Sequence, residues 1–155
     1  MIEHVLTVCV GNICRSPAAQ SLLMHQLPTL AVSSAGLQAL DGQGIDPPMR
    51  ALLQAAGVQP HAHQARTLSS WMLAQSSLVL VMDAQQRAHI ERQYPTTRGR
   101  VYRLGEHIGP KGCDIPDPYR QDESTYAHVF ALIEEGVSRW RQRIEAIGYS
   151  AAQPA

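Results

Sequence analysis

Short, mainly apolar runs alternate along the chain with longer segments that carry helix signals. The runs are rich in valine and leucine, and they cover residues 5–10, 30–34, 77–82 and 101–104. Runs of this kind are typical of strands buried on both faces of a parallel sheet. The other segments consist mostly of good helix formers and cover residues 18–27, 46–56, 68–75, 84–93 and 123–147. We therefore predict an α/β fold of three layers, in which helices cover both faces of a four-stranded parallel sheet.

Local start and stop signals set the expected helix ends. Ser16 followed by Pro17 is a typical N-cap and first helical position, and Asp46 before a proline opens the next helix. Gly57 supplies a C-terminal stop for that second helix. In the last segment, one helix face collects the apolar residues Val129, Leu132, Ile133, Val137, Trp140 and Ile144.

Length and charge narrow the function classes. The chain has 155 residues, which suits a single domain, expected over residues 1–148 with a frayed tail at 149–155. Its 13 basic and 13 acidic residues give no global field that would draw it onto nucleic acid or an anionic membrane. No apolar stretch approaches the roughly 18 residues that span a bilayer, and the amino terminus lacks signal-peptide features. We expect a soluble, cytoplasmic protein without membrane insertion, whose three cysteines are reduced thiols.

The segment from Cys9 to Pro17 places a thiol, five intervening residues and a guanidinium between the first strand and the first helix. Sheets of this class bind ligands beyond the carboxyl ends of their strands. A loop at that position can turn backbone N–H groups inward, and the following helix adds the positive end of its dipole, which suits a phosphate dianion. Arg15 can hold two phosphate oxygens at once, as a lysine cannot. The alternative is that Cys9 and Cys14 are inert core thiols and that Arg15 is a surface cation. A strand directly before these residues and a helix start directly after them favour the phosphate site instead.

The field that binds phosphate also favours the thiolate form of Cys9, and Ser16 can donate a hydrogen bond to that sulfur. Gly11 and Asn12 are residue types that tolerate positive φ, which a tight cradle requires. Because a reactive thiolate is open to oxidation, we hypothesise a reversible disulfide between Cys9 and Cys14. The alternative is that Cys14 is a packed small residue. These features predict a cysteine-dependent phosphate monoester hydrolase.

Such a reaction needs a proton donor for the leaving oxygen, and mobile acidic loops commonly supply one. Asp117 lies between two prolines in the long loop of residues 105–120, and Tyr119 offers an aromatic face to a substrate ring. The residues Asp114, Asp122 and Glu123 are rival carboxylates. The residues alone do not choose among these four side chains.

Metal and nucleotide sites lack support in the sequence. His61 and His63 are spaced as metal ligands can be, but no cysteine or histidine pair has the spacing of a zinc finger. Gly42 and Gly44 lack the rest of a dinucleotide fingerprint, and no Walker-type lysine follows. We expect no metal and no cofactor.

Four motifs resemble, in their order, those of the low-molecular-weight protein-tyrosine phosphatases. They are Val8–Pro17, Ser33–Gly36, His63–Arg66 and Asp117–Tyr119, and the resemblance covers nearly the whole chain. The chain resembles in particular the bacterial members that are paired with tyrosine autokinases of polysaccharide export. The resemblance implies that the substrate is a phosphotyrosine protein, for which a membrane tyrosine autokinase is one candidate. It also implies a phosphocysteine intermediate at Cys9. It further implies a phosphate clamp at Arg15 and general acid and base catalysis by Asp117.

The resemblance also assigns supporting roles. It implies a phosphate-binding loop made of Val10, Gly11, Asn12, Ile13, Cys14 and Ser16. Ser34 and His63 would join Asn12 in a polar network that supports the loop, and Leu40 and Tyr119 would contact the substrate. Leu40 stands where eukaryotic members carry an aromatic wall, and Arg120 stands where they carry a second tyrosine. A slot between Leu40 and Tyr119 still fits a flat phenyl ring, so phosphotyrosine is favoured over phosphoserine.

Two other functions stay open at the level of sequence. Arsenate reductases can share this fold and phosphate loop, but they need further cysteines as redox relays, and Cys113 alone is a poor relay. A catalytically silent phosphate-binding or regulatory module is the second alternative. The presence of both Cys9 and Asp117 argues against a silent module.

Overall fold

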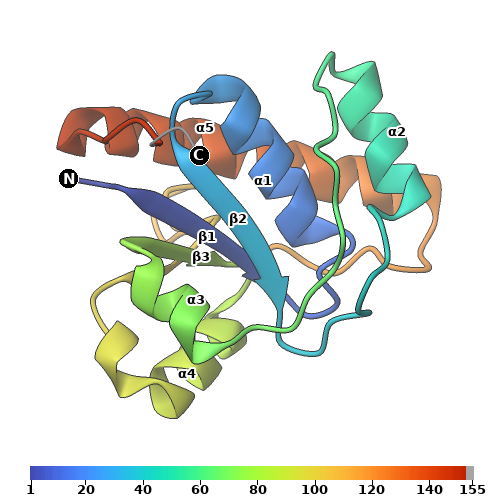
Figure 1. The fold of residues 1–155 in the computed structure, drawn as a ribbon. Helices are drawn as coiled ribbons and strands as arrows, with labels where there is room; N and C mark the ends of the chain where they lie inside the picture. Colours follow the sequence, from blue (N-terminus) through green and yellow to red (C-terminus); the bar gives the residue numbers. More distant parts are fainter. Residues whose placement is uncertain (153–155) are drawn as a thin grey trace.

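Four parallel strands form the centre of the protein, and helices cover both faces of the sheet (Figure 1). They are seen in the computed structural model, which describes residues 1–152. The strand order is β2-β1-β3-β4, so β1 has a neighbour on each side. The predicted α/β architecture is therefore confirmed. In chain order the elements are β1 (His4–Cys9), α1 (Arg15–Gln26), β2 (Ala31–Gly36), α2 (Pro47–Ala55), α3 (Ser70–Gln75), β3 (Leu78–Val81), α4 (Ala84–Gln93), a short 3-10 helix (Pro95–Thr97), β4 (Val101–Arg103) and α5 (Glu123–Ile147).

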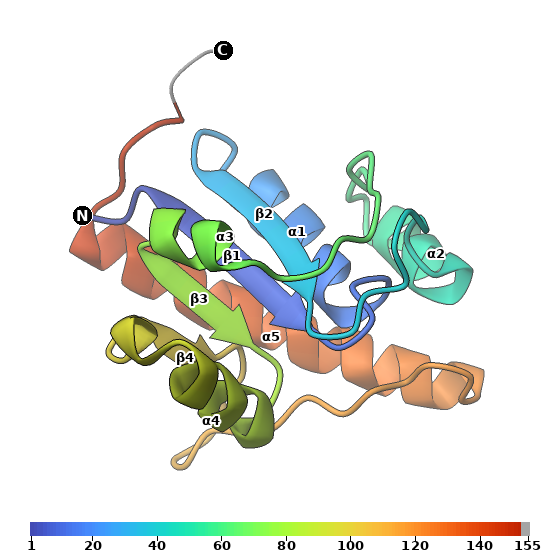
Figure 2. The same ribbon diagram turned by 60° about the horizontal axis from the view of Figure 1, so that its bottom comes forward.

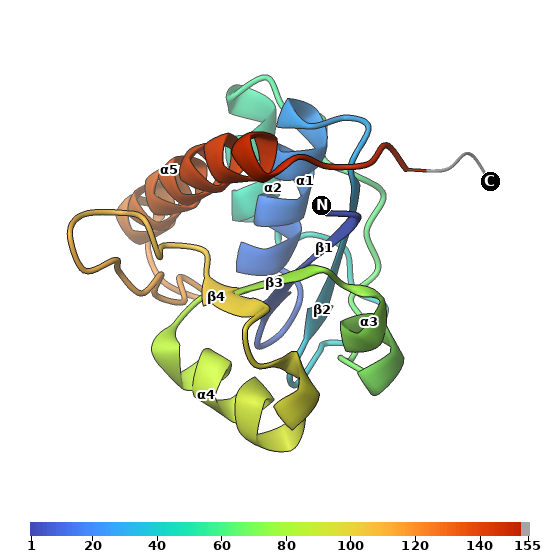
Figure 3. The ribbon, with the colours of Figure 1, turned by 90° about the vertical axis from the view of Figure 1, so that its left-hand side faces the viewer.

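The strands are mainly apolar because helices pack on both faces of the sheet. Val5 of β1 and Leu78 of β3 belong to the core shared with α1, α2 and α5. Their neighbours Leu6 and Val79 point to the opposite face and belong to the core shared with α3 and α4. Figure 3 shows this separation, with α1, α2 and α5 on one side of the sheet and α3 and α4 on the other. Successive strand residues point to opposite faces, so uninterrupted apolar runs are what such a sheet requires.

The parallel register brings distant loops to one edge of the sheet. Cys9 at the end of β1 lies opposite Gly36 at the end of β2. Figure 2 shows the arrowheads of β1, β2 and β3 pointing in the same direction. The loop before α5 returns to this edge, where the Ile115 N–H donates to the Met82 carbonyl just beyond β3 (2.8 Å). Loops that follow β1, β2 and β4 therefore meet beside Cys9.

Helices α4 and α5 have the predicted bounds, because a carboxylate caps each of them. The Asp83 side chain accepts a hydrogen bond from the Gln86 N–H at the start of α4. Asp122 accepts one from the Thr125 N–H at the start of α5. Such side-chain caps satisfy amide groups that have no partner within the helix, and they mark the boundary in the sequence.

The start of α1 differs from the prediction. The helix begins at Arg15, Cys14 occupies the N-cap position, and Ser16 lies inside the first turn. The Ser16 hydroxyl contacts the sulfur of Cys9 and the side-chain amide of Asn12, so it does not cap the helix. Tertiary contacts have replaced the local capping interaction. The first amide groups of α1 consequently carry no side-chain cap.

Strand β2 extends two residues beyond the predicted end, through Gly36. Gly36 also forms a bridge with Thr67, which lengthens the pairing at this edge of the sheet. A Cβ atom added at Gly36 would lie 2.5 Å from the carbonyl oxygen of Val10 and 2.9 Å from Cβ of Asn12. The close approach of β2 to the loop after β1 therefore requires glycine here.

The chain after α5 turns back along the amino terminus. Tyr149 forms a parallel bridge with Ile2, and the Ser150 N–H donates to the Ile2 carbonyl (3.0 Å). The expected frayed tail is thus tied down at residues 149 and 150, and its residues 153–155 lie outside the described part of the chain. None of the helices within residues 1–152 combines the length and the apolar character needed to cross a bilayer.

Candidate active site

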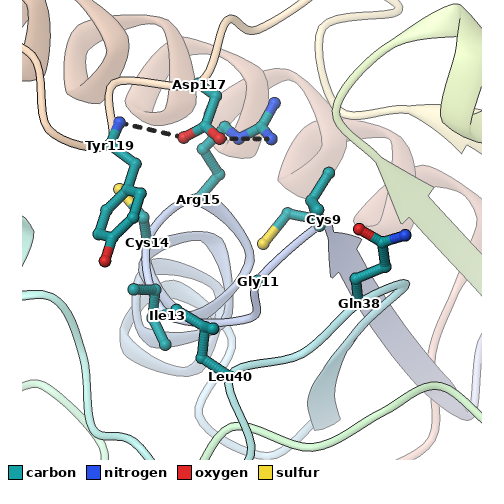
Figure 4. A pocket seen from close by; sticks show the side chains of 10 residues that line it. Cys9, Gly11, Ile13, Cys14, Arg15, Gln38, Leu40, Asp117 and Tyr119 are labelled. Atoms are coloured by element: carbon teal, nitrogen blue, oxygen red, sulfur yellow. Dashed lines mark hydrogen bonds and ion pairs between the residues drawn. The ribbon is translucent and has the colours of Figure 1, made fainter.

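A pocket of about 190 Å³ lies at the carboxyl end of β1, and three separate stretches of the chain line it (Figure 4). These are the loop between β1 and α1, the loop after β2 and the loop before α5. Typical sites for drug-sized ligands occupy roughly 300–1,000 Å³, so this pocket suits a single side chain. The lining residues are Cys9, Val10, Gly11, Ile13, Cys14, Arg15, Gln38, Leu40, Asp117 and Tyr119.

The loop between β1 and α1 turns at Asn12, which is buried and has a φ of 56°. Asparagine is one of the few residues other than glycine that adopt this left-handed conformation at low cost. Gly11 does not have positive φ, and a Cβ added to it would make only ordinary contacts, the nearest at 3.7 Å from Ile13. The expectation that the cradle needs positive φ at Gly11 was therefore wrong, whereas the expectation for Asn12 was correct.

The side chain of Asn12 holds the loop in shape. Its Oδ1 accepts a hydrogen bond from the backbone N–H of Arg66 (2.9 Å), and this obligatory donor fixes the orientation of the amide group. Its Nδ2 then donates to the hydroxyls of Ser16 (2.8 Å) and Ser34 (3.0 Å). Nε2 of His63 contacts the Asn12 backbone carbonyl at 2.5 Å. The structure thus brings together all the residues of the predicted supporting network.

The sulfur of Cys9 lies at the bottom of the pocket, 2.9 Å from the Ser16 hydroxyl. Both residues are almost fully buried, Cys9 at 2% exposure and Ser16 at 0%. Since Asn12 already donates to the Ser16 oxygen, the hydroxyl hydrogen of Ser16 is free to point at the sulfur. A hydrogen bond donated to sulfur favours its anionic form.

Cys14 lines the same pocket and is also buried. Burial first, and then the charges of Cys9 and Asp46, raise the pKa of the Cys14 thiol, so this group stays protonated at neutral pH. Cys113 lies outside the pocket, in the loop before α5, where its N–H donates to the Gly105 carbonyl. All three cysteines are free thiols.

Arg15 and Asp117 lie next to each other in the lining of the pocket. The Arg15 guanidinium is buried and donates from Nη1 to the Ile115 carbonyl (2.8 Å), while its Nη2 lies 3.7 Å from Oδ2 of Asp117. Oδ1 of Asp117 accepts a hydrogen bond from the Tyr119 N–H (3.1 Å). Figure 4 shows the carboxylate between Arg15 and Tyr119, at the mouth of the pocket. Its side chain is 50% exposed, so proton exchange with solvent is open.

The rival carboxylates have other partners. Asp114 forms an ion pair with Arg103 (3.1 Å), and Asp122 caps α5. Glu123 is exposed in the first turn of that helix. Only Asp117 of the four carboxylates lines the pocket.

The loop after β2 forms the remaining wall and is pinned to the loop after β1 by backbone hydrogen bonds. The N–H groups of Leu37, Gln38 and Leu40 donate to the carbonyls of Cys9, Val10 and Gly11 at 2.9–3.0 Å. Leu40 and Tyr119 are the two substrate-contacting residues expected from the sequence, and both line the pocket. Gln38 also lines it, and sequence reasoning missed this residue. A polar residue in an irregular loop carries no signal of its own.

His61 and His63 contact each other, Nε2 of His61 lying 3.0 Å from Nδ1 of His63. Within residues 1–152, no three histidine, cysteine or carboxylate side chains are arranged to hold a metal ion. The two histidines instead connect α1 to the loop after β1.

Comparison with known proteins places the chain among phosphatases. Residues 4–148 match the family model described as low molecular weight phosphotyrosine protein phosphatase. The chain is 40% identical over 148 residues to the probable low molecular weight protein-tyrosine-phosphatase EpsP of Ralstonia nicotianae, a match that covers 96% of this chain and 100% of the relative.

Two solved structures share the fold over almost their full length. The tyrosine phosphatase Wzb from Escherichia coli K30 in complex with sulphate is 32% identical with a TM-score of 0.87, covering 93% of this chain and 99% of that one. Vibrio vulnificus Wzb in complex with benzylphosphonate is 34% identical with a TM-score of 0.86, covering 91% and 98%. Since the family model spans nearly the whole chain and the relatives align end to end, this protein belongs to the low molecular weight protein-tyrosine phosphatases.

Proposed function

We propose that this phosphatase uses Cys9 as the nucleophile, Arg15 as the phosphate clamp and Asp117 as the proton donor. The observation that carries the proposal is their convergence on one pocket. Cys9 forms its floor, and the Asp117 carboxylate stands 3.7 Å from the guanidinium of Arg15 at its mouth. Two side chains of one loop and a third, about 100 residues further along the chain, thereby surround a space for one phosphate group and one ring.

In the first half-reaction, the thiolate of Cys9 attacks the phosphorus atom, and the bond between phosphorus and the tyrosine oxygen breaks. Uncapped amide groups of the loop and of α1, together with Arg15, stabilise the charge on the phosphoryl oxygens. The Asp117 carboxyl group, at the mouth of the pocket, donates its proton to the leaving oxygen. The products are free tyrosine side chain and a phosphocysteine.

In the second half-reaction, water attacks the phosphorus atom of the phosphocysteine. The Asp117 carboxylate left by the first step accepts a proton from this water. The bond between phosphorus and sulfur breaks, and inorganic phosphate leaves. Cys9 returns to the thiolate, which the hydroxyl of Ser16 stabilises (2.9 Å). No cofactor takes part in either step.

The shape of the pocket favours an aromatic phosphomonoester. Cys9 is only 2% exposed, so a phosphate group must enter deeply before it can react. A phosphotyrosine side chain has the required length, and its ring can lie between the apolar surfaces of Leu40, Ile13 and Tyr119. A phosphoserine would have to bring its own backbone into the pocket mouth.

We further propose that the physiological substrate is a tyrosine autokinase of a bacterial polysaccharide export system. The similarity to EpsP and to Wzb supports this assignment, as does the resemblance of the four sequence motifs to partners of such kinases. A cytoplasmic location is part of the same proposal, because the reaction needs a reduced Cys9 and the three cysteines are free.

Reduction of arsenate is less well supported than phosphate hydrolysis. That reaction needs a second thiol that can reach the first one and then hand the disulfide onward. Cys113 does not line the pocket. Cys14 does, but its raised pKa opposes the thiolate that such a relay requires.

Aryl phosphates with leaving groups of different pKa test the proposed roles. Cys9→Ser should abolish turnover, whereas Cys113→Ser, the matched change outside the pocket, should retain it. Asp117→Ala should lose far more rate on an unactivated aryl phosphate than on an activated one, because only the poor leaving group needs the proton. Equal losses on both substrates would assign the acid to another residue, and turnover by Cys9→Ser would end the proposal.

The Cys9→Ser variant also serves to identify the substrate. It should retain phosphoproteins that the parent releases, and mass spectrometry of the retained material should find a kinase phosphorylated on its own tyrosines. Vanadate should displace this material, since it occupies the same pocket. A retained protein without phosphotyrosine would contradict the assigned substrate class.

A further inference from the structure

A line of hydrogen bonds leads from helix α1 to the outside of the phosphate-binding loop. The Ser21 hydroxyl on α1 lies 2.6 Å from Nδ1 of His61. Nε2 of His61 lies 3.0 Å from Nδ1 of His63, and Nε2 of His63 lies 2.5 Å from the backbone carbonyl oxygen of Asn12. The backbone N–H of His61 also contacts the Ser21 oxygen, at 3.3 Å. Four residues from three parts of the chain thus form one connected path.

Only one arrangement of protons satisfies every contact in this path. A carbonyl oxygen can only accept, so Nε2 of His63 carries the hydrogen and its Nδ1 is a lone-pair acceptor. Nε2 of His61 must then donate to that acceptor, which leaves Nδ1 of His61 to accept from the Ser21 hydroxyl. The Ser21 oxygen keeps a lone pair for the N–H of His61. Each residue therefore donates to the next, from Ser21 through His61 and His63 to the Asn12 carbonyl, and both imidazoles must be neutral.

The surroundings of the two rings maintain that neutral state. Burial and then the neighbouring His63 lower the pKa of His61 to about 4. Burial lowers the pKa of His63, the hydrogen bond to the Asn12 carbonyl acts against this, and the charge of Arg66 lowers it again. Within residues 1–152, no carboxylate forms an ion pair with either ring. Both rings are consequently neutral at pH 7.

The last contact of the path controls the direction of one peptide group in the loop. The peptide between Asn12 and Ile13 is trans, so its carbonyl and its N–H point in opposite directions. His63 holds the carbonyl on the outside of the loop. The Ile13 N–H therefore faces the inside, where Ile13 lines the pocket. If this peptide turned over, a carbonyl oxygen would face the phosphate dianion, which repels it.

We propose that Ser21 and His61 are positioning residues of the phosphatase: they fix the tautomer of His63 and so keep the Ile13 amide directed at the bound phosphate. The inference rests on the proposed role of this loop in binding phosphate. It extends that role to two residues outside the pocket, one of them on a helix and neither in contact with substrate. His61 acts as a neutral donor to Nδ1 of His63. A carboxylate at this position could only accept a hydrogen bond, so it would place the hydrogen of His63 on Nδ1 and take it from Nε2.

Two substitutions of His61 separate hydrogen bonding from packing. His61→Gln keeps an N–H donor close to the position of ring Nε2, whereas His61→Leu has a similar size and donates nothing. Ser21→Ala removes the first donor and leaves both histidines in place. His128→Leu, at an exposed position on α5, is the matched control for loss of a histidine. Each variant is compared with the parent at pH 7.

Nitrogen-15 NMR of the imidazoles should show His63 as the Nε2–H tautomer in the parent, in His61→Gln and in His128→Leu. In His61→Leu the signals should indicate a mixture of tautomers. The affinity for vanadate and kcat/KM for an aryl phosphate should fall about 2- to 10-fold in His61→Leu, the worth of one neutral hydrogen bond. His61→Gln should recover most of this loss, and Ser21→Ala should show a smaller loss of the same kind.

Three results would overturn the inference. One is an unchanged His63 tautomer together with unchanged vanadate affinity in His61→Leu. Another is an equal loss in the Gln and Leu variants, since that would indicate packing alone. The third is the Nδ1–H tautomer of His63 in the parent. The NMR measurement does not depend on turnover, so it separates failure of this inference from failure of the proposed catalytic roles, which Cys9→Ser tests.

Discussion

Replacing Ser16 with alanine tests whether a single hydroxyl controls the reactivity of the Cys9 sulfur. The Ser16 oxygen lies 2.9 Å from the Cys9 sulfur, and both groups are buried, so water cannot take over the lost hydrogen bond. Hydrogen bonds to charged groups contribute about 1.5–3 kcal/mol. At about 1.4 kcal/mol per factor of ten, this energy corresponds to about a 10- to 100-fold loss of reactivity at the sulfur.

The rate at which iodoacetate alkylates Cys9 at pH 7 reports this reactivity directly. Alkylation should slow about 10- to 100-fold in Ser16→Ala. Ser34→Ala is the matched control, because Ser34 accepts from the same Asn12 amide (3.0 Å) without contacting the sulfur. Equal losses in both variants would mean that loop distortion is responsible, and an unchanged alkylation rate in Ser16→Ala would refute the reasoning.

Three further outcomes are expected. Gly36→Ala should lower both the free energy of unfolding, by about 1–3 kcal/mol, and the affinity for phosphate, because its Cβ would meet the Val10 carbonyl 2.5 Å away; unchanged values in urea denaturation and phosphate titration would contradict the close approach. Tyr126→Phe should cost about 1.5–3 kcal/mol of unfolding free energy in the same assay, since the hydroxyl donates to the Asp46 carboxylate and joins α5 to the start of α2. The folded pKa of His61 is about 4, below its ordinary value of 6.5, so the unfolded state binds more protons and stability should fall as pH decreases from 6.5 towards 4. A urea series at pH 7, 6 and 5 should show a smaller decrease for His61→Gln than for the parent, and parallel decreases would assign the effect to other groups.

Much of the fold could be predicted because local and tertiary preferences agree. The carboxylates Asp83 and Asp122 cap α4 and α5 by contacts three residues away, so the sequence itself carries the boundary. The strands are mainly apolar, and β3 is wholly so, because both faces of the sheet are covered. At α1 the local and the tertiary preferences disagree. Serine is a common N-cap residue, but the Ser16 hydroxyl contacts the sulfur of Cys9, seven residues earlier, and does not cap the helix. A local rule cannot detect such a competing partner.

The site divides in the same way. The loop from Cys9 to Arg15 could be predicted because its residues are adjacent in sequence and each has a chemical reason for its place. The choice of Asp117 among four carboxylates could not, since it depends on how the loop before α5 returns to the end of β3. Gln38 was missed because its position follows only from backbone pairing with the loop after β1. The hydrogen bond between Ser21 and His61 joins residues 40 positions apart, and no repeating pattern in the sequence indicates it.

The interior position of β1 has a consequence for the working cycle. A strand with partners on both sides exchanges its amide hydrogens only when the whole sheet opens, whereas the loop before α5 reaches the site through few bonds, among them those of Ile115 to Met82 and to Arg15. Opening of that loop should therefore need less free energy than opening of β1, so solvent can reach the pocket while Cys9 stays in place.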